Sequence, residues 1–202
     1  MMFINFVHQK LVSVPVLQKL DVANGTVWIG RDTRTSEEKG THRRTAEKDF
    51  IRLMLAGILD EPSVVIEHKP SGEPYLPVFP GLFISISHSG GWYAAYISSS
   101  QRVGVDIQVP RESILKGTDY FLNDLERSNA HWIKDLDILH RLWGAKEALY
   151  KLLGGAEQEP EKAFTASTVE TKDPGMVAIE HEGKEYLLTA AKYEEYYLVY
   201  SI

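Results

Sequence analysis

The chain has 202 residues, of which 44% are hydrophobic and 25% charged, a composition typical of a globular protein with a real core. It has no cysteine, which excludes disulfides, thiolate zinc sites and a cysteine nucleophile, and its net charge of −6 argues against generic nucleic-acid binding. No apolar run approaches the length of a membrane span, and the N-terminal MMFINFVHQK lacks a signal-peptide pattern. We therefore expect a cytoplasmic protein.

The first half of the chain, residues 1–101, is expected to form one α+β subdomain. Apolar spacing predicts strands at 3–7 and 26–29, a polar loop at 30–40, and a helix that ends near residue 59. A further strand is expected at 63–67, followed by an irregular, turn-rich segment at 70–77. Alternation at 83–89, the Gly90-Gly91 turn and the apolar run 92–98 together predict a β-hairpin.

The second half, residues 102–202, is expected to form a similar α+β subdomain. It begins with a strand at 103–108 and continues with a partly helical segment at 111–130. A long helix is predicted from about residue 133 to 153, where Gly154-Gly155 ends it. Strands are then expected at 163–169, 176–180, 185–193 and 196–202. The halves share no evident sequence identity, so any duplication would be structural.

Asp106 is the most unusual residue of the predicted strand 103–108, because β-forming residues surround its carboxylate. A buried aspartate is costly unless a cation, a metal or several donors stabilise it. The simpler alternative is an aspartate at a strand end that accepts backbone N–H bonds from the next turn. The sequence patterns on either side of this strand, at 83–90 and 143–151, bear on which alternative applies.

One face of the predicted long helix also carries polar groups: His140, Trp143, Glu147 and Lys151 fall within an arc of about 80°. In isolation, Glu147 and Lys151 could be a surface ion pair that contributes little. Together with Asp106, however, Glu147 supplies the two carboxylates that suit Mg²⁺, which takes few protein ligands and keeps phosphate oxygens in its shell. Lys151 and His88 add cations, so the set fits a diphosphate-bearing substrate better than a carbonyl substrate.

Three segments in order resemble the motifs of the 4′-phosphopantetheinyl transferases, specifically the larger, single-chain surfactin-synthetase-activating type. They are FISISHSG at 83–90, GVDIQ at 104–108 and WGAKEALYK at 143–151. The resemblance spans about residues 70 to 155, roughly two fifths of the chain. Each motif alone is weak, but three in the right order and spacing are specific.

The resemblance implies an α+β fold of two similar subdomains in pseudo-twofold arrangement, each a helix packed on a small, mostly antiparallel sheet. Coenzyme A would bind in the cleft between the subdomains. The implied metal ligands for Mg²⁺ are Asp106 and Glu147, with Gln108 uncertain. The implied coenzyme A contacts are Ser87, His88 and Lys151 at the diphosphate, and Arg43 and Arg44 at the 3′-phosphate.

The implied reaction is attack by a serine of an apo acyl or peptidyl carrier protein on coenzyme A, which releases 3′,5′-ADP. The implied catalytic residues are Glu147, Lys151 and His88. Glu147, or a water held beside it by the metal, would accept the serine proton, while Lys151 and His88 would neutralise phosphate charge. The carrier is usually acidic, as this chain is, so docking requires a local basic or apolar patch; Arg111, Lys116 and Arg127 are candidates by position. We expect a monomer.

Two departures from the family pattern support a different hypothesis. Gln108 stands where the family often has glutamate, and Glu73 stands where it often has the lysine of Gly-Lys-Pro. Both changes are compatible with a non-catalytic coenzyme A or carrier-protein binding module of the same fold. A serine hydrolase that uses Ser87 or Ser89 is a poor alternative, because adjacent strand residues point to opposite faces and no G-x-S-x-G is present.

Overall fold

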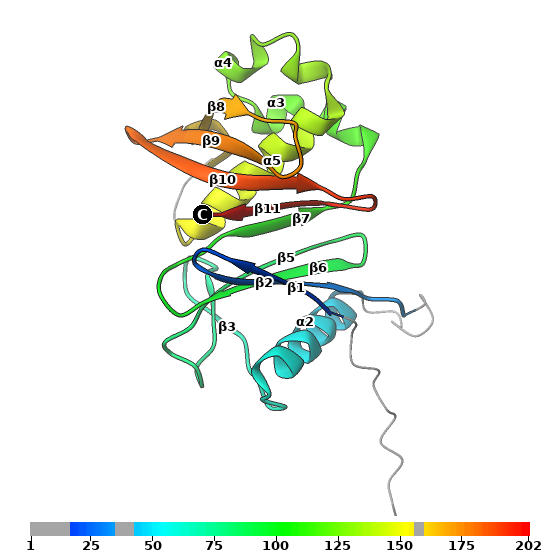
Figure 1. The fold of residues 1–202 in the computed structure, drawn as a ribbon, viewed down its shortest axis with the longest axis vertical. Coiled ribbons are helices and arrows are strands. Elements are labelled where there is room, and N and C mark those ends of the chain that lie inside the picture. Colours follow the sequence, from blue (N-terminus) through cyan, green and yellow to red (C-terminus); the bar gives the residue numbers. More distant parts are fainter. Residues whose placement is uncertain (1–16, 35–42, 156–159) are drawn as a thin grey trace, which may run out of the picture.

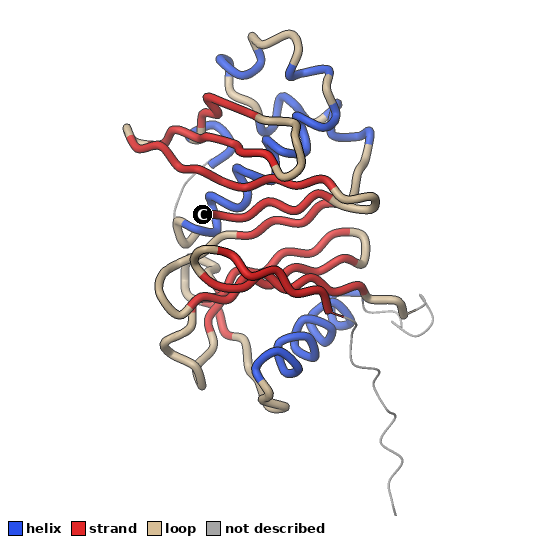
Figure 2. Tube along the Cα trace, viewed as in Figure 1, coloured by secondary structure: helices blue, strands red, loops and turns tan. Residues whose placement is uncertain are grey.

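The computed structural model describes residues 17–34, 43–155 and 160–202 (Figure 1). Within this part of the chain two antiparallel sheets form the framework, and each carries a 17-residue helix. Figure 2 shows the strands of both sheets crossing the middle of the molecule, with a long helix at one end and short helices at the other. No helix in the described ranges is long and apolar enough to cross a membrane.

The first sheet has the strand order β1-β2-β6-β5, and every neighbouring pair is antiparallel. Its strands are β1 (Leu17–Val22), β2 (Gly25–Arg31), β5 (Phe83–Ser89) and β6 (Trp92–Ser98). Helix α2 (Arg43–Leu59) covers it and buries Phe50, Met54 and Leu55 in a core shared with β5 and β6. The strands β3 (Glu67–His68) and β4 (Pro74–Tyr75) form a separate two-stranded ribbon.

The second sheet has the order β7-β11-β10-β9-β8 and is also antiparallel throughout. Its strands are β7 (Val105–Gln108), β8 (Thr165–Val169), β9 (Gly175–His181), β10 (Lys184–Lys192) and β11 (Tyr197–Ser201). Helix α5 (Leu136–Leu152) packs its leucine face on this sheet. The remaining helical elements among the described residues are η1 (Glu112–Lys116), α3 (Thr118–Phe121), α4 (Asp124–Arg127), η2 (Trp132–Lys134) and α6 (Pro160–Ala163).

The two sheets share a third apolar core. Val27, Ile29 and Tyr96 of the first sheet are buried together with Ile107 and Leu198 of the second. Burial of this kind is the main favourable term in packing one layer on another. β5 and β7 are the strands at which the two sheets meet, and we call this boundary the seam. The shared apolar core holds the two sheets together there.

The predicted α+β class is confirmed, with two sheet-containing halves consistent with a pseudo-twofold arrangement. The hairpin 83–98, the helix ending at residue 59 and the four C-terminal strands are also found. The division at residues 101 and 102 stays a prediction, and the expected strand 3–7 lies outside the described residues.

Three local predictions were wrong. Residues 63–66 form no strand, because the Glu61 side chain and carbonyl accept the N–H groups of Ser63 and Val64 in a turn. The long helix does not begin at residue 133: Asp135 accepts the N–H groups of Asp137 and Ile138 and so caps α5 at Leu136. Strand β4 lies inside the segment expected to be irregular.

Candidate active site at the seam of the two sheets

Three serines at alternate positions of β5 bridge the seam between the sheets. Ser85 Oγ accepts the Val105 N–H at 3.0 Å, and Ser89 Oγ accepts the Val109 N–H at 3.2 Å. Between them, Ser87 Oγ donates to Asp106 Oδ1 at 2.7 Å. Side chains two apart in a strand share a face, so alternating serines can satisfy the edge of β7 and hold its carboxylate.

Helix α5 reaches the same carboxylate because Gly104 allows close approach. A Cβ at Gly104 would lie 1.9 Å from the carbonyl oxygen of Ala148, so only glycine lets the helix lie directly on this segment. One turn further along α5, Lys151 Nζ contacts Asp106 Oδ1 at 2.9 Å and the Val105 carbonyl at 3.0 Å. The buried aspartate thus has a cation, as its position in a strand required.

A pocket of about 370 Å³ opens on the α5 side of the seam. Its walls include His88 from β5, Asp106 and Gln108 from β7, and Trp143 and Glu147 from α5. The three sequence motifs, which span residues 83 to 151, therefore meet in one cavity. Lys151 instead borders a smaller hollow of about 140 Å³, together with Glu73, Pro74, Tyr150 and Gly154.

Gln108 lies beside Asp106, and His140, for which the sequence predicts no role, contacts Gln108. Gln108 Nε2 donates to Asp106 Oδ2 at 2.7 Å, and Gln108 Oε1 lies 3.0 Å from His140 Nδ1. The backbone N–H of Arg111 donates to His140 Nε2 at 3.1 Å. Burial lowers the pKa of His140 below its usual value, which favours the neutral ring. The sequence signal that could have identified His140 is its position on the same face of the predicted helix as Trp143, Glu147 and Lys151.

His88 is exposed and stacks on Tyr93 of β6, with ring centroids 5.5 Å apart. Its neighbour Ser87 points to the other face and donates to Asp106. The Ser87 hydroxyl is therefore oriented by a carboxylate across the seam and not by the adjacent imidazole, which argues against a serine hydrolase.

Of the two arginines predicted to bind a phosphate, only Arg44 has a side chain among the described residues. Arg44 is exposed in the first turn of α2 and is not part of the pocket wall. Arg43 begins the same helix, and its side chain lies outside the described residues. Glu73 is paired with Arg102 at 3.1 Å and with Lys69 at 3.0 Å, so the acid that departs from the family pattern is neutralised locally.

Lys146, the first lysine of the α5 motif, is part of the protein interior. Its Nζ contacts Glu126 Oε2 at 2.6 Å and the Phe121 carbonyl at 2.8 Å, and both charged side chains are at most 2% exposed. Glu126 also accepts the N–H groups of Asn123 and Ala166. This pair joins α4, α5 and β8 on the far side of the helix from Asp106.

The donor set fits Mg²⁺. Within the described ranges, no group of three or more His, Cys, Asp or Glu is arranged to hold a metal ion. Asp106 and Glu147 nevertheless face the same pocket. Two carboxylates with water and substrate oxygens are a usual set for Mg²⁺, which seldom takes an all-protein cage.

The fold and the site define a class: an α+β protein whose two sheets meet at a seam with a pocket that the carboxylates Asp106 and Glu147 line. No family model matches the chain. A 4′-phosphopantetheinyl transferase of Bacillus subtilis is 30% identical to it over 183 residues, which cover 84% of this chain and 80% of that protein. The chain belongs to the 4′-phosphopantetheinyl transferase family and is a homologue of that enzyme. The resemblance predicted from the three motifs is thereby confirmed.

Proposed function

We propose that the protein transfers the 4′-phosphopantetheine moiety of coenzyme A to a serine of an apo acyl or peptidyl carrier protein, with Mg²⁺ and with release of 3′,5′-ADP. The observation that carries this proposal is the meeting of Asp106 and Glu147 on one pocket, with Lys151 in contact with Asp106. Membership of the transferase family supports the same reaction.

Asp106 and Glu147 are the residues that would hold Mg²⁺. The ion would neutralise charge on the coenzyme A diphosphate and orient its oxygens. Lys151 is proposed to contact the same diphosphate, and its contact with Asp106 supports this role. His88, exposed at the pocket wall, and Ser87 are the remaining proposed diphosphate contacts.

In the proposed reaction the carrier serine oxygen forms a bond to the phosphorus that bears pantetheine. The anhydride bond from that phosphorus to the bridging oxygen of the diphosphate breaks, and this oxygen leaves with 3′,5′-ADP, so a phosphoester bond to serine replaces a phosphoanhydride bond. Glu147 is the proposed acceptor of the serine proton. Lys151 and His88 stabilise negative charge on the phosphate and leaving oxygens.

Further contacts are proposed from position. Arg43 and Arg44, at the first turn of α2, are proposed to bind the 3′-phosphate, with the ligand crossing the boundary that we place between residues 101 and 102. For the carrier, Arg111 and the exposed Lys116 are better candidates than Arg127, because Arg127 already pairs with Asp124. An acidic carrier needs such a local patch on a chain whose net charge is −6.

The test is incubation with coenzyme A, Mg²⁺ and apo carrier proteins of several classes, read as the mass of an added phosphopantetheine arm. Asp106→Asn and Glu147→Gln should each abolish transfer while the fold is retained. Glu194→Gln is the matched control, because Glu194 is an exposed acid between β10 and β11, outside the pocket wall and away from the proposed carrier contacts in sequence. No transfer to any carrier, or full activity in both site variants, would reject the proposal.

The second candidate is a non-catalytic module that binds coenzyme A or a carrier. The engaged amide of Gln108 and the local pairing of Glu73 favour it. Calorimetry with coenzyme A and carrier, followed by analysis for free 3′,5′-ADP, separates the two: binding without 3′,5′-ADP indicates a module, and stoichiometric 3′,5′-ADP indicates the transferase.

A further inference from the structure

The amide of Gln108 is engaged at both ends. The residue is 8% exposed, its Nε2 donates to Asp106 Oδ2 at 2.7 Å, and its Oε1 lies 3.0 Å from His140 Nδ1. A side-chain amide has two donors on nitrogen and an acceptor oxygen, so its orientation follows from its partners. Because the Asp106 carboxylate can only accept a hydrogen bond, the Gln108 amide turns its nitrogen toward Asp106 and its oxygen toward His140.

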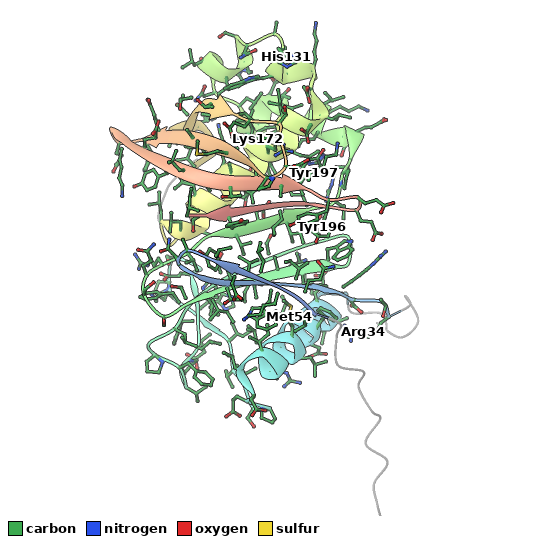
Figure 3. The ribbon with its side chains drawn as sticks, in the orientation of Figure 1. Arg34, Met54, His131, Lys172, Tyr196 and Tyr197 are labelled. Carbon is green, nitrogen blue, oxygen red and sulfur yellow. The ribbon has the colours of Figure 1, made fainter. Side chains whose placement is uncertain are left out.

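The backbone of Arg111 fixes the same orientation from the other side. Its N–H can only donate, and it points at His140 Nε2 at 3.1 Å, so Nε2 must carry the lone pair. The proton of the neutral ring therefore sits on Nδ1 and is donated to Gln108 Oε1. Tyr197, labelled in Figure 3 at the start of β11, stacks on the imidazole with centroids 4.6 Å apart and holds its plane.

Helix α5 leaves space for this amide. A Cβ at Gly144 would lie 2.9 Å from Gln108 Nε2 and 2.7 Å from Val199 Cγ2. Glycine within a helix costs about 1 kcal/mol relative to alanine, so its presence here is explained by the close approach of β7 and β11. The amide is thus confined by the helix as well as by its hydrogen bonds.

We propose that Gln108 is a positioning residue for Asp106, oriented by His140, and not a metal ligand. The proposal rests on the proposed function in so far as Asp106 binds the metal. Asp106 Oδ1 already accepts from Ser87 and Lys151, and Oδ2 accepts from Gln108. The remaining lone pair of Oδ2 is the one left for a cation. For Gln108 to offer its oxygen instead, the amide would have to turn, face Asp106 with Oε1 and leave His140 Nδ1–H without an acceptor.

The first experiment uses the metal-free protein and nitrogen-15 spectroscopy of the histidine rings. We expect His140 to carry its proton on Nδ1, and Gln108→Met to change the Nδ1 signal. A ring protonated on Nε2 would overturn the inference. This result does not depend on transfer activity: failure to modify a carrier would reject the proposed function, and a wrong tautomer would reject this inference alone.

The second experiment compares two replacements of His140 that each keep one end of the ring. His140→Asn keeps a donor near the position of Nδ1, and His140→Gln keeps a polar group near Nε2 only. The Mg²⁺ dissociation constant is measured by calorimetry with coenzyme A bound, beside kcat and the KM for Mg²⁺. Outer partners of metal ligands are typically worth about 10- to 100-fold in affinity. We expect that loss in His140→Gln and Gln108→Met, and binding within about threefold of the wild type in His140→Asn.

Two outcomes would contradict the inference. If His140→Gln binds Mg²⁺ as tightly as the wild type or tighter, the freed Gln108 oxygen is a ligand. If His140→Asn and His140→Gln lose affinity equally, the ring acts through packing on Tyr197 and not through its Nδ1–H. Thermal unfolding of each variant, measured in parallel, separates loss of fold from loss of positioning.

Discussion

Replacing Lys146 by methionine removes the cation from a buried ion pair that joins α4, α5 and β8. Methionine has a similar length, so the change leaves little cavity and mainly leaves Glu126 charged in a site that is 1% exposed. The two backbone N–H groups that Glu126 also accepts remain, but no cation does. We therefore expect a large loss of stability.

Removal of one partner from a buried ion pair costs about 3–5 kcal/mol. For a chain of this length, each kcal/mol shifts the midpoint of thermal unfolding by about 2–4 °C, so Lys146→Met should unfold about 6–20 °C below the wild type. Circular dichroism during heating measures the shift. The exposed Lys172, whose side chain is 70% accessible, supplies the control Lys172→Met, which should change the midpoint little.

The double variant Glu126→Gln, Lys146→Met tests the cause. With both charges absent no buried ion is left unpaired, so the double variant should be more stable than Lys146→Met alone. If Lys146→Met unfolds within about 2 °C of the wild type, or if the two changes add without coupling, the pair does not contribute to stability in this way.

Three further predictions concern the seam and its supports. In the proposed reaction Lys151 stabilises the charge that develops on the phosphate, so Lys151→Met should lower kcat by about 100- to 1000-fold; activity equal to that of Lys172→Met would contradict this role. Gly104→Ala should destabilise the fold by about 1–3 kcal/mol or more, since its Cβ would meet the Ala148 carbonyl at 1.9 Å, whereas Gly117→Ala, with no neighbour closer than 3.6 Å, should melt near the wild type. Burial lowers the pKa of His140, so the unfolded chain takes up a proton near pH 6.5 that the folded chain resists; stability is full above that pH and falls as the pH decreases through it. His140→Asn should flatten this part of the profile between pH 8 and pH 5, and an unchanged slope would refute the assignment.

The sequence by itself determined the fold class and the positions of the chemical groups. Alternation in FISISHS, the charge within GVDIQ and the polar arc of the long helix are local patterns, and each needs only a few neighbouring residues to be recognised. Strand β1 was missed because it is an edge strand whose residues are all partly or fully exposed, so no clear hydrophobic alternation marks it.

Only the tertiary structure decided which partner each group takes. Lys146 and Lys151 lie five residues apart in one motif, yet one is buried against Glu126 and the other contacts Asp106. His140 and Gln108 are 32 positions apart, and their hydrogen bond fixes the direction of an amide whose role the sequence left open. Hydrogen-bond partners depend on how strands and helices pack, and no local periodicity encodes that packing.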